Sequence, residues 1–501
     1  MTAITGYRLS RRMSVTLGFL FSAVGCLFLA DIAISSISPW DEFSRIVAGF
    51  MAPDLSMLDQ VGRALLTTLA FAILGVALAA IMGFVLALMY RNVFVRIGAA
   101  ILRSIHELFW ALIFLQFFGL HPITGLLAIA VPYSGVFAKI YAEILEDSSP
   151  VPQRILPIGT GRFIALLYSR IPQAWPHLCS YTRYRFECGI RTSAILGFIG
   201  IPTLGYYLEA SFAQGFYSEV ATLLLLFYIL IGTMRFWFKP WLIPIMLMGA
   251  PFMLDRGMPI VWSNLQRFFT EDIIPSPLRN AETLWALDPW WSLGQWLEAL
   301  YSTQILPGLW NTLVLSQIAL VLTGMLALVL FPLVSRRLIP DKKTRLGGHI
   351  VLIVARSTPE YLLAYMLLQL WGPSMLPAII ALSIHNGGLI AFLVGLRSNS
   401  VSLRKDTSTG INRYCYEVVP RIYNSFLAYL FYRWEVIIRE TAILGVLGIH
   451  TLGFFVDSAI QEIRFDVAMV LIAIAALVNL LVDSVARRLR RSLQLKHYSG
   501  C

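Results

Sequence analysis

The stretch YRFECGIRTSAILGFIGIPTLGYYL (184–208) returns 248 positions later as YRWEVIIRETAILGVLGIHTLGFFV (432–456). Over the first 22 positions of this pair, 14 residues are identical. The shared positions include one acid, one arginine and three glycines in each copy: Glu187/Glu435, Arg191/Arg439, Gly197/Gly445, Gly200/Gly448 and Gly205/Gly453. Hydrophobic composition alone does not produce such identity, so the chain carries an internal duplication.

The composition is that of a membrane protein. Of the 501 residues, 58% are hydrophobic and 13% are charged, whereas soluble domains carry about 25% charged residues. The mean hydropathy is +0.73. Runs long enough to cross about 30 Å of hydrocarbon lie near 13–34, 62–90, 95–119, 122–145, 182–212, 217–237, 239–255, 306–334, 346–371, 374–397, 427–457 and 465–486. We therefore expect about twelve helices, six in each half.

Lys and Arg fall on one side of the membrane under this assignment. The basic clusters are Arg8, Arg11 and Arg12; Arg91 and Arg96; Arg154 and Arg162; Arg336, Arg337, Lys342, Lys343 and Arg345; and Arg487, Arg488, Arg490 and Arg491. The loops at 35–59 and 256–303 lean acidic. The positive-inside rule then predicts cytoplasmic termini and outward-facing acidic loops. This asymmetry explains the net charge of +11. Nucleic-acid binding is not expected, because the sequence has no basic stretch with interleaved aromatic residues.

The apolar segment 13–34 follows Arg11 and Arg12, as in a signal peptide. Its length of about 22 residues exceeds the 7–15 of a signal-peptide core, so we expect a retained helix. The cysteines show no CxxC spacing and predict neither a disulfide framework nor a metal site; they are Cys26, Cys179, Cys188, Cys415 and Cys501.

Two further segments repeat in the same order. LLTTLAFAILGVALAAIMGFVLALMYRNV resembles LWNTLVLSQIALVLTGMLALVLFPLVSRRL and shares Thr68/Thr312. RSIHELFWALIFLQFFG resembles RSTPEYLLAYMLLQLWG and aligns Arg103/Arg356, Ser104/Ser357 and Glu107/Glu360. The same order in both halves predicts tandem parallel repeats, 1–237 and 238–501, the second with its outward loop 256–303. Their pseudo-twofold axis would run along the membrane normal, with a pathway between them.

Between the fourth and fifth helices, each half carries a polar stretch on the cytoplasmic side. The portion RFIALLYSRI can form a short amphipathic helix, which would either lie on lipid headgroups or dock a cytoplasmic partner. The loop GTGRFIALLYSRIP (159–172) resembles the EAA loop of importer-type ABC permeases in its glycine-to-proline spacing. Residues 153–155 depart from the EAA tripeptide, and in the second copy Gly410 stands ten residues before Pro420.

The combined motifs resemble the permease family of phosphonate import systems, the PhnE type. The carrying segments are MAPDLS, RSIHELFWALIF, RIPQAWPHLCSYTRYRFE and IRTSAILGFIGIPTLG, with RSTPE, YRWEVIIR, AILGVLG and SIHNGG in the second half. Single permeases of that family resemble one half of this chain. The resemblance implies an all-α, polytopic fold of two parallel six-helix repeats of the MetI-like ABC permease type.

The resemblance also implies partners: a cytoplasmic ABC ATPase dimer, a periplasmic substrate-binding protein, and a location in the bacterial inner membrane. No G-x4-G-K-[ST] motif occurs in the chain, so ATP and Mg²⁺ would be bound by the ATPase and this chain would carry no cofactor. The residues that we expect to contact the ATPase are Gly159, Arg162, Ser169, Pro172, Gly410 and Pro420.

The repeated charges have two interpretations. Glu187 and Arg191, like Glu435 and Arg439, are spaced i to i+4 and can form structural ion pairs on one helix face. Arg103 with Glu107 and Arg356 with Glu360 have the same spacing. Alternatively, Arg191 and Arg439 line the pathway and hold an oxyanion, since guanidinium suits bidentate recognition of phosphonate or phosphate.

The repeated glycines and the fourth helices add further candidates. Gly197, Gly200, Gly445 and Gly448 either allow close helix packing or form a gate that bends. Ser134 and Asn386 are candidates for a neutral polar pathway lining. His385 could carry a proton, but Pro132 occupies its matching position, so a structural role is the alternative.

The resemblance implies a permease without catalytic residues, which imports phosphonate or a related phosphorus oxyanion such as phosphate or phosphite, and the two parallel repeats suit alternating access. An ion-gradient-driven secondary transporter is the first alternative, because parallel repeats suit it equally. A membrane scaffold or receptor is the second.

Overall fold

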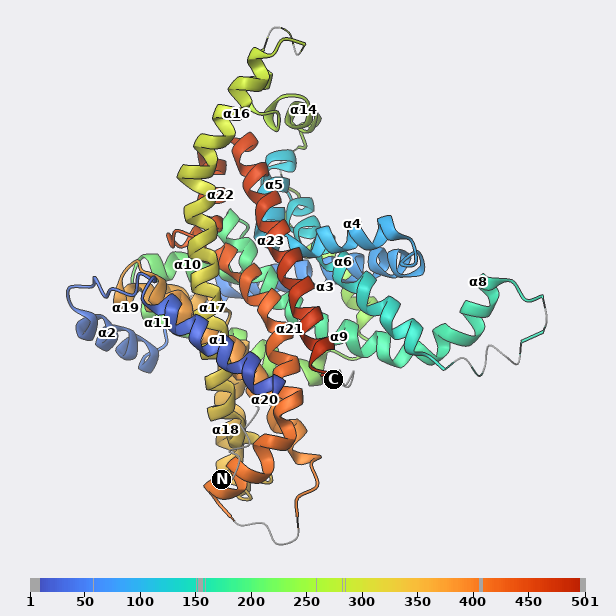
Figure 1. Cartoon of the computed structure of the whole chain (residues 1–501), viewed down its shortest axis with the longest axis vertical. Helices are drawn as coiled ribbons and strands as arrows, with labels where there is room; N and C mark the ends of the chain where they lie inside the picture. The colour runs from blue at the N-terminus through green and yellow to red at the C-terminus, as the bar shows by residue number, and fades with distance from the viewer. Residues whose placement is uncertain are drawn as a thin grey trace, which may run out of the picture. The chain divides into compact units, whose positions relative to one another are not determined.

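The computed structural model describes residues 10–56, 58–149, 151, 156–157, 159–257, 259–281, 283, 285–404 and 409–495. Every regular element among these residues is a helix, so the all-α expectation is confirmed (Figure 1). Residues 153–155, at the position of the EAA tripeptide, and Arg8 and Cys501 lie outside the described residues.

The chain folds into two compact units. The first unit comprises Ser44–Asn280, and the second comprises Ala281–Ser499 together with the N-terminal segment up to Phe43. The sequence division at 237/238 separates the repeats differently, because it assigns the N-terminal helix to the first half and residues 238–280 to the second.

Packing explains both differences. On α1 (Arg11–Leu27), the Phe19 ring lies 5.3 Å from that of Phe431 and 5.1 Å from that of Trp434. The hydroxyl groups of Thr16 and Tyr423 are hydrogen-bonded at 2.6 Å. In the first unit, Phe268 packs edge-on against Phe117 with centroids 4.7 Å apart. These aromatic contacts hold each segment to the unit that contains its partner.

The helices of the first unit follow one another in the order of the repeat. They are α3 (Leu58–Leu88), α4 (Val93–Ser104), α5 (Glu107–Phe118), α6 (Pro122–Asp147), α8 (Arg162–Ala165), η1 (Leu166–Arg170), α9 (Ile171–Ile195), η2 (Leu196–Ile199), α10 (Leu204–Ala213), α11 (Tyr217–Gly232), α12 (Met234–Trp237), α13 (Ile243–Gly249), η3 (Ala250–Met253), α14 (Trp262–Arg267), η4 (Phe268–Asp272) and α15 (Ser276–Arg279). The boundary between the units falls within α2 (Pro39–Met51).

The second unit repeats this order after α1. Its helices are α16 (Asp288–Leu300), η5 (Tyr301–Ile305), α17 (Leu306–Leu330), η6 (Phe331–Val334), α18 (Lys342–Ser357), α19 (Glu360–Trp371), α20 (Met375–Asn399), η7 (Arg413–Val418), α21 (Val419–Val446), α22 (Leu452–Gln461) and α23 (Phe465–Ser492). The pair α3 and α6 packs extensively in the first unit, as α17 and α20 do in the second. The duplication seen in the sequence is therefore a duplication of packing.

The helices support a multi-pass membrane protein. Among the described residues, five helices are long and apolar enough to span a membrane, and up to eight spans result if each bent pair of helices counts as one. The expected number was about twelve. The shortfall comes from short helices: α1 has 17 residues, α11 has 16, and α13 with η3 covers Ile243–Met253.

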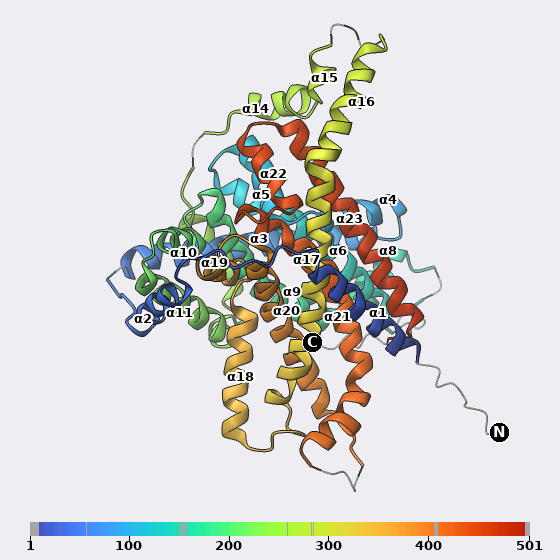
Figure 2. The same ribbon diagram turned by 60° about the vertical axis from the view of Figure 1, so that its left-hand side comes forward.

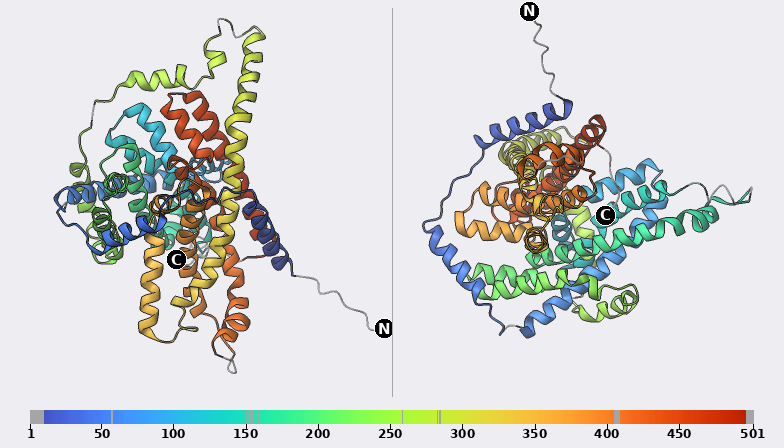
Figure 3. Two further views of the ribbon diagram at one scale, coloured as in Figure 1. Left: turned by 90° about the vertical axis from the view of Figure 1, so that its left-hand side faces the viewer. Right: turned by 90° about the horizontal axis from the view of Figure 1, so that it is seen from below.

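The expected outward loop at 256–303 is largely helical. The segment Asp288–Val334 is continuous through α16, η5 and α17, and the left-hand view of Figure 3 shows it as one long rod. Trp290 and Trp291 lie exposed on α16, and Trp262 lies exposed on α14. These tryptophans suit a membrane interface or a protein contact.

The third helix expected in each half is two helices. The angle is 92° between α4 and α5 and 89° between α18 and α19, so neither 95–119 nor 346–371 is one continuous helix, although each bent pair can still form one broken span (Figure 2). Different residues break the two copies. His106 caps α5, because its Nδ1 accepts a hydrogen bond from the backbone N–H of Leu108 at 3.1 Å. Pro359 takes the same position in the second copy and excludes the helical conformation at Thr358.

Candidate functional site

The two loops that precede the fifth helices share a glycine in the left-handed conformation. Gly159 has φ +96° and Gly410 has φ +70°, and among the described residues no atom lies within 4 Å of a Cβ built on either. A β-branched residue would be strained at such a φ angle. The sequence singled out both glycines, and the structure places both at turns.

Each turn leads into the long fifth helix through a wide π-helical turn. Pro172 stands at the start of α9 directly after η1, and Pro420 stands at the start of α21 directly after η7. A proline lacks the N–H that a tight turn would use, and a wide turn relieves the clash of its ring with the preceding carbonyl. The two prolines are therefore equivalent although the loops differ in length.

The first loop exposes apolar side chains. Phe163 is 68% exposed and Tyr168 is 72% exposed, while Ser169 is buried and donates to the carbonyl of Ala165 at 2.5 Å. Arg162 begins α8, and its side chain lies outside the described part. The second loop exposes Ile411 and Tyr416 in the same way. Exposed aromatic and aliphatic groups on a short helix suit a protein contact.

Inside the first unit, α6 and α9 meet at a hydroxyl pair. The hydroxyl groups of Tyr133 and Thr192 lie 2.8 Å apart, and the Arg185 guanidinium stacks 4.8 Å from the centre of the Tyr133 ring. Ser134 is fully buried, and its hydroxyl donates to the carbonyl of Val131 at 2.6 Å. Its role as a pathway lining stays a prediction.

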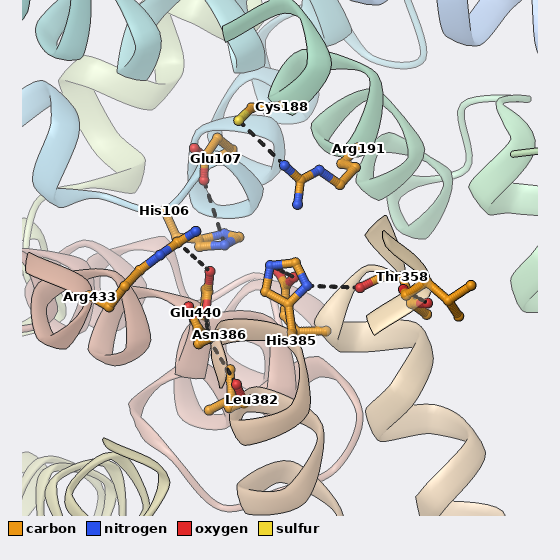
Figure 4. Close-up of polar contacts among 12 residues, drawn as sticks. His106, Glu107, Cys188, Arg191, Thr358, Leu382, His385, Asn386, Arg433 and Glu440 are labelled. Atoms are coloured by element: carbon orange, nitrogen blue, oxygen red, sulfur yellow. Dashed lines mark hydrogen bonds and ion pairs between the residues drawn. The ribbon is translucent and has the colours of Figure 1, made fainter. Parts of the chain in front are cut away.

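The second unit replaces this neutral contact with a charged one. Asn386 and Glu440 occupy the positions of Tyr133 and Thr192, and the Asn386 amide donates to a carboxylate oxygen of Glu440 at 2.9 Å (Figure 4). Arg433, the counterpart of Arg185, has a guanidinium nitrogen 4.0 Å from the other Glu440 oxygen. The same crossing of helices α20 and α21 therefore carries an additional buried carboxylate.

A histidine lies beside the repeated glutamate in each unit. His106 Nε2 is 3.6 Å from Glu107 Oε2, and His385 Nε2 is 3.9 Å from Glu360 Oε2. The two histidines come from different elements: the position of His106 holds Pro359 in the second copy, and the position of His385 holds Pro132 in the first. Both units therefore have a histidine–glutamate contact, but the histidine comes from a different sequence position in each unit.

The predicted ion pairs fare differently. Glu187 and Arg191 share α9, and Glu435 and Arg439 share α21, so the required helix register is present. A guanidinium nitrogen of Arg191 lies 3.5 Å from the sulfur of Cys188 (Figure 4). The pairs themselves stay predictions.

For the other two pairs, the shared helix was wrong. Arg103 ends α4 while Glu107 begins α5, and Arg356 ends α18 while Glu360 begins α19. An arginine at a helix C-terminus and a glutamate at a helix N-terminus each lie at the favourable end of a helix dipole. The Arg356 guanidinium also lies 4.2 Å from the centre of the Phe392 ring.

The repeated glycines end the fifth helix and let the next helix approach. A Cβ on Gly205 would collide with the carbonyl oxygen of Ala194, and a Cβ on Gly197 would collide with the backbone N of Tyr206. Gly445 and Gly453 make the equivalent contacts with Phe454 and Ala442 in the second unit. Close packing therefore holds at Gly197 and Gly445, whereas a Cβ on Gly200 or Gly448 would meet no atom closer than 3.5 Å among the described residues.

The expected single spans 182–212 and 427–457 are broken at this point. Gly200 with φ +87° and Gly448 with φ +89° terminate the helices, and the first unit bends by 53° there. The glycine-rich runs are helix ends, where hydropathy alone indicated continuous helices.

Sequence reasoning missed Arg185 with Arg433 and the pair Thr192 and Glu440. Arg185 and Arg433 could have been found, since both lie in the repeated YR of the opening stretch. Glu440 differs from its counterpart, so the repeat gave no signal for it.

Comparisons with known proteins agree with this organisation. The chain is 22% identical to the phosphate-import permease protein PhnE of Mycolicibacterium smegmatis over 483 residues. The aligned region covers 90% of this chain and 89% of that protein. It is 32% identical over 234 residues to HtxC of Stutzerimonas stutzeri, a protein named for phosphite transport. This aligned region covers 43% of this chain and 83% of HtxC. The chain belongs to this family of transport permeases.

A third relative of the family, the phosphite transport system permease protein PtxC of Stutzerimonas stutzeri, is 29% identical over 225 residues, which cover 43% of this chain and 81% of PtxC. Most of each shorter permease corresponds to less than half of this chain, so the chain consists of two such permeases joined in tandem. It is a transport permease and not an enzyme. No family model and no solved structure matches it.

Proposed function

We propose that the chain is the transmembrane permease subunit of an ATP-driven ABC importer for a phosphorus oxyanion: phosphonate, phosphate or phosphite. The observation that carries this proposal is the match to permeases named for phosphate and phosphite transport. The substrate would be delivered by a periplasmic binding protein. The chain would lie in the bacterial inner membrane with both termini in the cytoplasm.

The two loops that begin at Gly159 and Gly410 would each dock on one subunit of a cytoplasmic ATPase dimer, which binds the ATP and Mg²⁺. The exposed apolar groups at Phe163, Tyr168 and Tyr416 support this role. Each loop continues into a long helix, α9 or α21, which can transmit movement. The shorter second loop predicts unequal contacts with the two ATPase subunits.

The complete fold would be the MetI-like arrangement of two six-helix repeats, with the short helices α1 and α11 completing the set of about twelve. In this arrangement Arg191 and Arg439 would hold the anion transiently, Ser134 and Asn386 would line the pathway, and the glycine-terminated helix ends would act as gates. Guanidinium groups suit this task because their planar donors match two phosphonate oxygens.

One observation favours a second candidate, a secondary transporter driven by an ion gradient. Glu107, Glu360 and Glu440 are all buried, and buried carboxylates within a membrane often belong to ion pathways. Helices that bend at about 90° beside two of them also occur in such transporters.

Uptake into proteoliposomes separates the two candidates. The full chain would be reconstituted with its ATPase, with ATP inside, and with binding protein and labelled phosphonate, phosphate or phosphite outside. We expect uptake that requires internal ATP and persists after an ionophore collapses all ion gradients. Uptake that follows the gradient without the ATPase would establish the secondary transporter.

A further inference from the structure

The second unit brings two carboxylates and an imidazole together. Glu360 at the start of α19, His385 within α20 and Glu440 on α21 place one potential ligand atom each within 4.8 Å of one another. All three residues are buried, with at most 9% of their surface exposed. Three separate helices converge on this cluster, so it does not arise from neighbouring positions in the sequence.

The hydrogen bond of His385 fixes which ring nitrogen faces the cluster. Nδ1 lies 2.9 Å from the carbonyl oxygen of Thr358 (Figure 4). A carbonyl can only accept, so Nδ1 carries a proton. In the neutral ring, Nε2 then presents its lone pair toward Glu360 Oε2, 3.9 Å away. A lone pair that faces a carboxylate calls for either a proton or a metal ion between the two atoms, and metal-binding histidines are oriented by this kind of second bond.

Asn386 supplies an independent observation. It is fully buried, and its amide nitrogen donates to Glu440 and to the carbonyl of Leu382 at 3.0 Å. Within the described part of the chain, its Oδ1 has no hydrogen-bond partner. A buried acceptor without a donor is destabilising. A cation at the cluster would satisfy this oxygen.

In the described part of the first unit, no such arrangement is found. There the Nδ1 of His106 accepts the N–H of Leu108, so Nε2 carries the proton and points its donor toward Glu107. Thr192 replaces the second carboxylate, and Tyr133 replaces the asparagine. The first unit therefore turns a ring donor toward its glutamate where the second unit turns a lone pair, and it provides an internal control.

We propose that Glu360, His385 and Glu440 bind a divalent transition-metal ion, with Asn386 Oδ1 as an additional ligand. Mixed imidazole and carboxylate ligands suit zinc, cobalt, manganese or iron. Metal–ligand bonds of about 2.0–2.2 Å require the ligand atoms to approach to about 3.5 Å, which rotation of the two carboxylates provides. The ion would join α19, α20 and α21. The cysteine pattern gave no indication of it, and it is independent of the transported substrate.

Cobalt(II) tests the site directly, because its visible absorption reports coordination. The purified full chain in detergent, stripped with a chelator and freed of any affinity tag, would be titrated with cobalt. We expect one equivalent to bind per chain, and zinc to displace it. Cobalt would also raise the unfolding temperature, since it binds the folded state.

Two matched variants locate the ion. Glu440→Gln keeps the shape and the acceptor for Asn386 but removes a charged ligand, so the cobalt dissociation constant should rise at least about tenfold. Glu107→Gln changes the equivalent glutamate–histidine pair of the first unit and should leave cobalt binding unchanged. Equal affinity of the wild type and Glu440→Gln would overturn the proposal.

If Glu440→Gln fails to fold, cobalt titration of the wild type alone still tests the proposal. No saturable cobalt absorption and no rise in unfolding temperature at millimolar cobalt would show that the His385–Glu360 contact holds only a proton. That outcome would also overturn the metal site.

Discussion

The hydroxyl of Thr68 accepts a hydrogen bond from the backbone N–H of Leu204 at 2.9 Å, and Thr312 does the same for Leu452 at 3.0 Å. Each hydroxyl donates its own proton to the carbonyl four residues earlier in its helix, at 2.7 Å. The repeated threonine thus ties the second helix of each half to the first N–H of the helix that follows the glycine-rich break. Both atoms are buried, so water cannot replace the bond.

Loss of this bond should destabilise each unit. Thr68→Val keeps the shape of the side chain but leaves the N–H of Leu204 without its acceptor, at a cost of about 1–3 kcal/mol. Thr312→Val should have a similar effect, and the two should add because they lie in different units. Thermal unfolding of the purified protein in detergent measures this. Thr67→Val, on the same helix with its hydroxyl donating to Arg63, is the control. An equal shift for Thr67→Val and Thr68→Val would remove the capping role.

The contact between Gly205 and Ala194 leaves no space for a methyl group. Gly205→Ala should therefore separate α10 from the end of α9, at a cost of about 1–3 kcal/mol or more. Gly453→Ala should act alike in the second unit. Gly62→Ala is the control, since a Cβ there meets no atom within 4 Å among the described residues. The yield of monodisperse protein and its unfolding temperature would be compared. A Gly205→Ala protein as stable as Gly62→Ala would contradict the close packing.

The sequence predicted the all-helical class, the tandem repeat and the repeated glycines at turns and helix ends, because each depends on local patterns. It did not predict the bends at His106 and Pro359. A hydropathy average over a whole span does not detect a break of only two residues. The two copies also break the helix with different residues, so comparison of the repeats gave no signal. The membership of α1 in the second unit also escaped prediction, since it depends on long-range packing of Phe19.

The cluster of Glu360, His385 and Glu440 shows a second limit. Comparison of the two halves emphasises positions that agree, such as Arg191 and Arg439. The cluster arises where the halves differ, and its members come from three helices. Only the folded chain brings them together.

Arg191 and Arg439 provide a test of substrate contact. Replacing either with Gln should raise the KM for the phosphorus oxyanion in proteoliposome uptake, because a charge-assisted donor is lost. An increase of about tenfold corresponds to about 1.4 kcal/mol. Lys should restore part of the effect, since it keeps the charge but loses the planar fork. Arg183→Gln on the exposed side of α9 is the control. An unchanged KM in both Gln variants would leave these arginines a structural role.

Gly159→Val tests the proposal that the loop beginning at Gly159 couples transport to ATP hydrolysis. Valine is strained at φ +96°, so the turn should change while the helices that insert into the membrane remain. We expect normal insertion and assembly but a lower ATPase rate in response to loaded binding protein. Gly161→Val is the matched control, because Gly161 is not left-handed and a Cβ there also meets no described atom within 4 Å.

Gly410→Val should weaken coupling through the second loop. Because that loop is shorter, a smaller effect for Gly410→Val than for Gly159→Val would indicate unequal contacts with the ATPase subunits. Wild-type stimulation in both variants would show that neither turn takes part in coupling.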